Sequence, residues 1–171
     1  TLANVSALID VDPDRAQQLL GLYTDFLRDS MRLATTPEWP LASELQMIER
    51  YLQIQQVRFP DMTYAIEAEA DPLDTRIPPL LLHPLVENAF MHGLAPAGNR
   101  GHIRIGCCYQ NNGLQLLVED DGAGPPAAST SAEAQTSANT IGASSTRSNG
   151  LALDNIRARL HHRYGPGASL T

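Results

Sequence analysis

Three short segments of the sequence carry polar groups whose types and spacing suit ligand binding. The first is "LVENAFMHGL" (85–94), which is apolar enough for a buried helix. On such a helix Asn88 and His92 lie four residues apart and share one face. The apolar residues of the segment would be buried on the other side: Leu85, Val86, Ala89 and Phe90. An amide oxygen is a suitable ligand for Mg²⁺, so Asn88 is a candidate metal ligand. The alternative is an Asn that caps the helix or braces a loop, with His92-Gly93 simply ending it.

The second segment, "VEDDGAGPP" (118–126), follows a predicted strand and contains two glycines separated by one residue. Gly122 and Gly124 would let the backbone approach a ligand closely, because glycine has no side chain in the way. The carboxylate of Asp120 could accept a hydrogen bond from an exocyclic amine such as that of adenine. The alternative is a surface turn, since Asp-Gly pairs are common in turns.

The third segment, "SNGLALDNI" (148–156), places Gly150 just before an apolar helix. Backbone N–H groups at a helix N-terminus can bind phosphate without a lysine. That matters here because all 12 basic residues are arginine. The alternative is a loop that simply leads into a helix.

The surrounding pattern predicts the elements that would position these segments. The expected elements, in chain order, are a helical pair within 1–34, a break at 35–40, a helix over 41–59, a half-buried strand over 62–70, a helix ending at His92 or Gly93, a hairpin within 101–124 that turns at Asn111-Asn112-Gly113, a mobile loop over 125–149, a helix over 149–165 and the start of a last strand. This order predicts an α+β fold, in which one mixed sheet carries helices on one face.

Composition narrows the function further. The net charge of −7 and the isoelectric point near 5.1 argue against a nucleic-acid-binding surface. Cys107 and Cys108 are adjacent, so they form no disulfide framework, which suits a reducing compartment; one is expected to pack and the other to face outward. No apolar run approaches the roughly 20 residues that span a bilayer. The wide apolar face of 1–34 needs a partner, which is either the domain's own core or a second subunit.

Taken together, the three segments occur in the order found in the Bergerat ATP-binding fold of gyrase and the histidine kinases. The wording of "PPLLLHPLVENAFMHG" (78–93), "GLALDNIRARL" (150–160) and "ERYLQIQQVRFPD" (49–61) resembles the LytS/AlgZ-type sensor histidine kinases in particular, and the resemblance covers essentially the whole chain. It implies a two-layer sandwich with a mixed sheet. Residues 1–34 would be the remnant of dimerisation and phosphoacceptor helices. Residues 35–171 would be the ATP-binding domain, with a flexible ATP lid at 125–149 and a truncated C-terminal end.

The resemblance also implies a site for ATP and Mg²⁺ formed by Asn88, His92, Asp120, Gly122, Gly124, Gly150 and Asn155. Asn88 would ligate Mg²⁺, His92 would lie near the phosphates, and Asp120 would accept a hydrogen bond from the adenine amine. Gly122 and Gly124 would shape the adenine pocket. Gly150 and the lid would cover the triphosphate, and Asn155 would support the site.

The activity implied is transfer of the γ-phosphoryl group to a histidine upstream of Thr1 and then to a response regulator. No catalytic residue is expected within the chain itself, because none of its histidines has the right context: His83, His92, His102, His161 and His162. The resemblance further implies a homodimer formed through the N-terminal helices. This part would be the cytoplasmic domain of a protein anchored in the bacterial inner membrane.

Some positions depart from the family pattern. Met91 replaces a lysine that contacts phosphate in relatives, and Ser148 and Ala152 stand where relatives have glycine. Pro84 occupies the place of the glutamate that activates water in the ATPases of this fold, and Glu87 points about 100° away around the helix. Phosphoryl transfer is therefore favoured over hydrolysis. The alternatives are a catalytically degenerate docking module, or another kinase or ATPase of the same fold.

Overall fold

The structure is a computed structural model that describes residues 2–33, 36–110, 113–122, 145–165 and 168. The chain divides into two compact units, Thr1–Gly124 and Pro125–Thr171, and each is described by itself. No helix in these described ranges is both long and apolar enough to cross a membrane.

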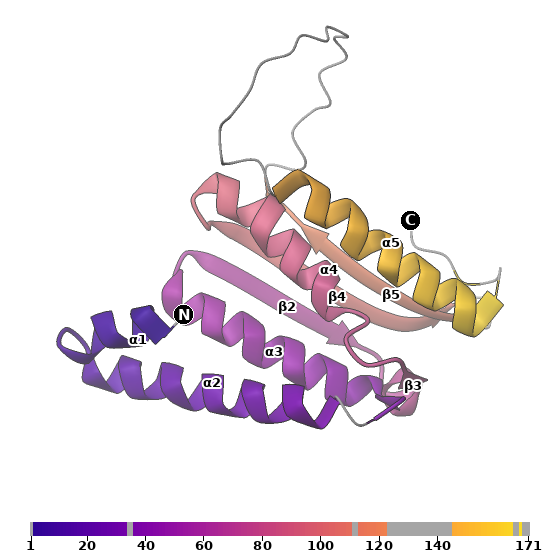
Figure 1. The fold of residues 1–171 in the computed structure, drawn as a ribbon, viewed down its shortest axis with the longest axis horizontal. Coiled ribbons are helices and arrows are strands. Elements are labelled where there is room, and N and C mark those ends of the chain that lie inside the picture. Colours follow the sequence, from indigo (N-terminus) through magenta and orange to yellow (C-terminus); the bar gives the residue numbers. More distant parts are fainter. Residues whose placement is uncertain (1, 34–35, 111–112, 123–144, 166–167, 169–171) are drawn as a thin grey trace, which may run out of the picture. The chain divides into compact units, whose positions relative to one another are not determined.

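A three-stranded mixed sheet runs through the first unit (Figure 1). Its strands are β2 (Met62–Ala68), β4 (Gly101–Gln110) and β5 (Gly113–Asp120), in the order β2-β4-β5. β4 is parallel to β2 and antiparallel to β5. Along β4, Ile103 and Ile105 are fully buried, whereas Arg104 between them is exposed. This alternation gives the sheet one apolar face and one polar face.

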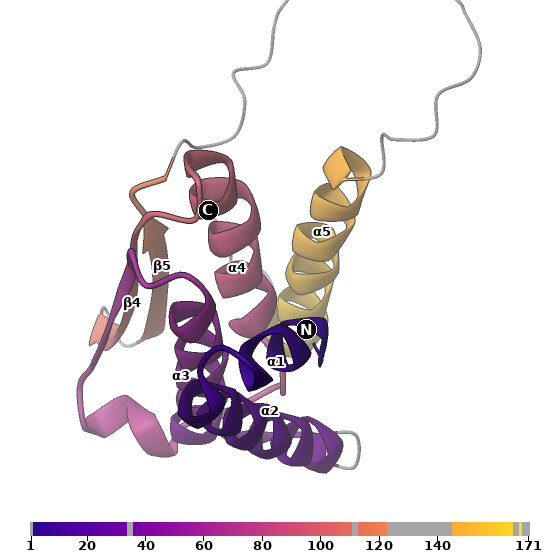
Figure 2. The same ribbon diagram turned by 90° about the vertical axis from the view of Figure 1, so that its left-hand side faces the viewer.

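Helices cover the apolar face. α3 (Leu41–Arg58) and α4 (His83–Asn88) lie on the same side of the sheet (Figure 2). The buried residues of α3 include Leu41, Leu45, Ile48 and Leu52, which recur at spacings of three and four. The predicted α+β fold, with a mixed sheet, helices on one face and a preceding helical segment, is therefore confirmed. The hairpin is confirmed as well, although Asn111 and Asn112 at its turn lie outside the described residues.

The N-terminal helical pair packs on α3. α1 (Leu2–Ile9) and α2 (Pro13–Leu33) contribute Val5, Ala16 and Leu19 to an apolar cluster that also contains Ile54 of α3. α3 is thus covered on two sides, by the sheet and by the helical pair.

α2 nevertheless keeps an apolar row on its surface. Leu20, Leu27 and Met31 are 48%, 58% and 76% exposed, and their spacing of seven and four residues places them on one side of the helix. Packing on the domain's own core is therefore observed for one side of the helical pair. A second subunit on the exposed side remains a prediction.

The structure adds one small element that the sequence did not predict. β1 (Trp39–Pro40) pairs antiparallel with β3 (Arg76–Ile77), which follows a short 3₁₀ turn, η1 (Asp71–Asp74). Residues 35–40 were expected to be only a break. Two residues are too short to show an alternating pattern, and proline is unusual in strands except at edges.

The second unit contains α5 (Ser145–Tyr164). The expected helix over 149–165 is present, but it begins at Ser145. Gly150 therefore lies inside the helix and not just before it, and residues 145–149 of the expected loop are helical. Residues 125–144 of that loop and most of the expected last strand lie outside the described residues.

Candidate functional site

The segment that carries Asn88 is a continuous helical stretch with three kinds of winding. α4 ends at Asn88 and is followed by a π-helical turn, η2 (Ala89–Leu94), and a 3₁₀ turn, η3 (Ala95–Ala97). Pro84 lies in the first turn of α4, where its missing N–H costs little. π turns are rare and are frequent at functional sites. Here the winding changes immediately after Asn88.

The burial of this segment matches the predicted division into an apolar side and a polar edge. Val86, Ala89 and Phe90 are buried and Leu85 is half-buried. Asn88 and His92 are half-buried and Met91 is 51% exposed. A half-buried amide can be reached by a ligand while its backbone stays fixed by the packed side.

Two adjacent carboxylates at the end of β5, those of Asp120 and Asp121, make different contacts. Asp120 lies opposite Ile103 in the ladder, and residues opposite each other in an antiparallel pair share a face. Since Ile103 is fully buried under the helices, the side chain of Asp120 lies on the helix side of the sheet. Its Oδ1 accepts a hydrogen bond from Gly122 N at 3.1 Å, and a carboxylate has capacity for further donors.

Asp121 is instead hydrogen-bonded to the backbone of His102. Its Oδ1 accepts a hydrogen bond from His102 N at 2.6 Å, and its own N–H donates to His102 O at 3.2 Å. These two bonds tie the end of β5 to the start of β4. Both carboxylates are exposed, but Asp121 is a structural residue that joins the two strands, whereas Asp120 lies beside Gly93 of the helical segment.

Two glycines bring the helical segment and the strand end into contact. A Cβ atom on Gly93 would overlap the Asp120 carboxylate, and a Cβ atom on Gly122 would overlap the backbone of Gly93. Position 122 therefore requires a residue without a side chain, whereas a side chain at position 93 would have to displace the Asp120 carboxylate. The consequence is that Asp120 and Gly122 lie against the end of the segment that carries Asn88 and His92. The sequence pattern assigns no role to Gly93 in the site, although its position directly after His92, the last polar residue of the helix, is a signal that could identify it.

The remaining predicted site residues are placed less completely. Gly150 and Asn155 lie in α5, where Asn155 is exposed. Gly124 lies outside the described residues. That Asn88, Asp120 and Gly150 line one cavity stays a prediction.

A buried carboxylate that the sequence analysis missed lies at the start of α4. Glu44 of α3 has no exposed surface. Its Oε1 accepts hydrogen bonds from Leu82 N at 2.9 Å and His83 N at 3.2 Å, and its Oε2 accepts from Trp39 Nε1 and Leu80 N, both at 2.9 Å. Burial raises the pKa of Glu44, and the hydrogen bonds oppose that rise. A signal was available, because Glu44 falls on the otherwise apolar face of the helix over 41–59.

An aromatic cluster joins α2, α3 and α4 at the same place. The ring of His83, the first residue of α4, lies 5.6 Å from that of Phe26 and 5.0 Å from that of Tyr51. Burial lowers the pKa of His83 and, together with the charge of Glu87, raises that of Tyr51 to about 12. His83 Nδ1 is buried and has no hydrogen-bond partner among the described residues. Its surroundings therefore favour the neutral imidazole.

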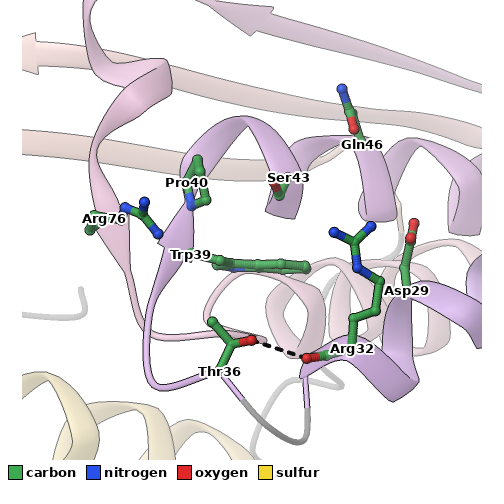
Figure 3. A pocket seen from close by; sticks show the side chains of 8 residues that line it. All are labelled: Asp29, Arg32, Thr36, Trp39, Pro40, Ser43, Gln46 and Arg76. Atoms are coloured by element: carbon green, nitrogen blue, oxygen red, sulfur yellow. Dashed lines mark hydrogen bonds between the residues drawn. The ribbon is translucent and has the colours of Figure 1, made fainter.

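A cavity of about 240 Å³ lies between the end of α2 and the start of α3. It is lined by Asp29, Arg32, Thr36, Trp39, Pro40, Ser43, Gln46 and Arg76. Figure 3 shows the indole of Trp39 extending across it toward Arg32, and Thr36 Oγ1 donating to Arg32 O at 3.1 Å. None of these residues belongs to the predicted ATP site. The cavity is connected to the start of α4 through Trp39, which donates a hydrogen bond to Glu44.

Within the described part of the chain, no three acidic, histidine or cysteine side chains converge as a metal site would require. The predicted Mg²⁺ would instead be held by Asn88 together with ligand oxygens, since Mg²⁺ commonly binds few protein groups beside substrate phosphates.

The known proteins that are similar in sequence to this chain agree with one another in kind. A family model described as "Histidine kinase" matches residues 1–63. The sensor protein LytS of Oceanobacillus iheyensis is 34% identical over 70% of this chain, and the sensor protein LytS of Staphylococcus haemolyticus is 31% identical over 99% of it. The sensor histidine kinase YpdA of Escherichia coli is 33% identical over 70% of it. The matched region spans only 21% to 28% of the length of these relatives.

Proposed function

Because this chain belongs to the family of LytS-type sensor histidine kinases, we propose that it binds ATP and Mg²⁺ as the ATP-binding part of a two-component sensor kinase. The observation that carries the proposal is the contact of Gly93 with Asp120 and Gly122. It joins two segments that are distant in the sequence and that both carry residues expected to bind nucleotide.

The residues present fit the nucleotide. The Asp120 carboxylate, exposed at the strand end, would accept a hydrogen bond from the adenine amine. The half-buried Asn88 amide would supply one oxygen ligand to Mg²⁺, and ATP phosphates would supply others. His92 would lie near the phosphates. Mg²⁺ would neutralise phosphate charge, and correct positioning would supply most of the catalysis.

The glycines and α5 would complete the site. The absence of side chains at Gly122 and Gly124 would leave room for the adenine ring. Gly150 and Asn155 would come from α5, and Gly150, inside the helix, weakens that turn by roughly 0.5–1 kcal/mol relative to alanine. The segment 125–149 is proposed to act as the ATP lid.

The proposed reaction moves the γ-phosphoryl group of ATP to the imidazole of a histidine that lies upstream of Thr1 in the full protein, with release of ADP. The phosphoryl group would then pass to an aspartate of a response regulator. Pro84 supports transfer over hydrolysis, because it offers no group that could activate water.

The assembly proposed is a homodimer formed through residues 1–34, with residues from 35 onward as the ATP-binding domain. The exposed row of Leu20, Leu27 and Met31 supports this, because an apolar helix face is stabilised when a second helix covers it. The parent protein is proposed to be anchored in a bacterial inner membrane, with this part in the cytoplasm.

Calorimetric titration with ATP and Mg²⁺ tests the proposal. Wild type should bind with a Kd of millimolar or tighter, and Asp120→Asn should weaken binding about tenfold or more, which corresponds to the loss of one buried hydrogen-bonded contact. Glu119→Gln is the matched control, because it removes one carboxylate from an exposed neighbouring position. Equal affinity of wild type and Asp120→Asn would contradict the proposed adenine contact.

A docking module without catalytic activity is the second candidate. The exposed row on α2 favours it, since such a surface can serve assembly without any nucleotide. The absence of binding heat in both wild type and Asp120→Asn would support this candidate and contradict the first.

A further inference from the structure

Glu44 joins α3 to the start of the helix that carries Asn88, and it does so through backbone atoms. We infer that Glu44 is a positioning residue, which holds the first turn of α4, and with it Asn88, where Mg²⁺–ATP binding requires it. The inference rests on the proposed function and goes beyond it, because Glu44 touches neither nucleotide nor metal in that site.

Glu44 accepts hydrogen bonds from backbone N–H groups at the N-terminus of α4. N–H groups in the first turn of a helix have no partner within the helix. Two donors at this end, Leu82 N and His83 N, are both taken by Glu44 Oε1. A negative charge at this end of a helix is also favourable, because the helix dipole is positive there.

A residue with a strained backbone, Leu80, lies two positions before Leu82. Leu80 has a φ of 56°, in the left-handed region that leucine rarely adopts. Such a conformation persists only where the surrounding structure holds it. Leu80 N donates to Glu44 Oε2 at 2.9 Å. The carboxylate therefore holds the chain on both sides of Leu81 as it enters α4.

Only a carboxylate can accept hydrogen bonds from all four N–H donors around Glu44. Each oxygen of Glu44 accepts two N–H groups. Glutamine has a single acceptor oxygen, and its NH₂ group would face two N–H donors. Buried donors without a partner are unfavourable, so the first turn of α4 would shift in Glu44→Gln.

A short, continuous helix connects the first turn of α4 to Asn88. Asn88 lies five positions after His83, and the chain between them is helical without interruption. Val86 is fully buried in this stretch, so its packing ties this part of the helix to the core. A displacement of its first turn is therefore passed to the Asn88 amide.

α2 reaches the same turn by two routes. Trp39, whose indole lines the cavity beside Asp29 and Arg32 of α2, donates from Nε1 to Glu44 Oε2. Phe26 of α2 lies against the His83 ring. The position of α2 is thus connected to that of Asn88 through the buried Trp39 and Glu44 and through the half-buried Phe26 and His83.

The test measures how much Mg²⁺ strengthens ATP binding. ATP affinity is determined by calorimetry with Mg²⁺ and with EDTA, and the ratio of the two is the readout. Glu44→Gln should lower this ratio about tenfold, as removal of groups that orient metal ligands commonly does, and should leave the affinity in EDTA unchanged. Asn88→Ala should lower the ratio as well. The double variant should be no worse than Asn88→Ala alone, because Glu44 acts through Asn88.

Ile54→Val is the control, since Ile54 is a buried residue of α3 that packs on the N-terminal helical pair and should affect stability without changing the ratio. Trp39→Phe removes one donor to Glu44 and should give a smaller loss; it keeps the test decisive if Glu44→Gln does not fold. An unchanged ratio in the folded variants, or losses that add fully to that of Asn88→Ala, would overturn the inference alone. If wild type binds no ATP, the proposed function fails and the inference fails with it.

Discussion

Gly122 packs directly on the backbone of Gly93, so the end of β5 and the end of the Asn88-bearing segment touch without a side chain between them. The β4–β5 hairpin separates the two glycines in the sequence, and a Cβ atom at Gly122 would overlap the backbone of Gly93. The adjacent Asp120 carboxylate lies where a side chain at position 93 would be. This arrangement makes the two glycines sensitive and distinguishable probes of the site.

Gly122→Ala should destabilise the first unit. The new methyl group would meet the backbone of Gly93, which cannot rotate away as a side chain can. We expect a loss of about 1–3 kcal/mol in the free energy of unfolding, measured by denaturant titration. Gly21→Ala is the control, because nothing lies near a Cβ atom there and alanine should stabilise α2 by roughly 0.5–1 kcal/mol. Equal stability of Gly122→Ala and wild type would contradict the observed contact.

Gly93→Ala should act on nucleotide affinity more than on stability. The methyl group would meet the flexible end of the Asp120 side chain and displace its carboxylate. ATP affinity should fall about tenfold, equivalent to about 1.4 kcal/mol, in a calorimetric titration. In an Asp120→Asn background the same substitution should have little further effect, because the group it displaces is already altered. Full additivity would show that Gly93 acts elsewhere.

The two cysteines should differ in reactivity. Cys107 is 3% exposed, and burial raises its pKa to about 11, so about one part in a thousand is thiolate at pH 8. Cys108 is only half-buried. In the folded protein iodoacetamide should label Cys108 first, and both should react in guanidinium, as peptide mass spectrometry would show. Labelling of Cys107 at the rate of Cys108 would contradict the assigned orientation of β4.

Glu44 should make stability depend on pH. Burial, the largest effect, raises the pKa of its carboxyl above the ordinary 4.5, so the folded state retains a proton that the unfolded state releases. Stability from this group is complete below pH 4.5 and is lost as pH rises through the folded pKa. The unfolding free energy of wild type minus that of Glu44→Gln should therefore decrease as pH rises from 4.5. A difference that increases with pH would mean that the hydrogen bonds outweigh burial.

Leu27→Glu should separate assembly from folding. Leu27 is 58% exposed on α2, so the substitution should change the unfolding free energy by no more than about 0.5 kcal/mol. The proposed dimer should dissociate, because a charge would enter its apolar face. Sedimentation equilibrium gives the readout, with Gln18→Glu, another exposed position on α2, as the control. An unchanged oligomeric state would show that this row is not the interface.

Much of the fold follows from the sequence, because the periodic segments are long. The spacing of apolar residues predicts α2 and α3, and alternation around an Asn-Gly turn predicts the β4–β5 hairpin. Opposite faces for Cys107 and Cys108 follow from the same alternation and are confirmed. The β1–β3 pair was missed because two-residue strands carry no period.

The site could be predicted only in part, because its geometry depends on contacts between distant segments. Asn88 and Asp120 stand out by residue type and position. The partners of Glu44 do not, since the hydrogen bond to Leu82 joins residues 38 apart in the sequence. The π turn after Asn88 and the start of α5 at Ser145 are also not predicted, because neither has a distinct residue pattern.

Hydrogen exchange with and without ATP–Mg²⁺, followed by peptide mass spectrometry, tests the central claim most directly. If Asn88, Asp120 and Gly150 surround one bound nucleotide, exchange should slow together in residues 85–94, 118–122 and 145–155, and this protection should disappear in Asp120→Asn. Unchanged exchange in these segments, or protection confined to one of them, would contradict the account.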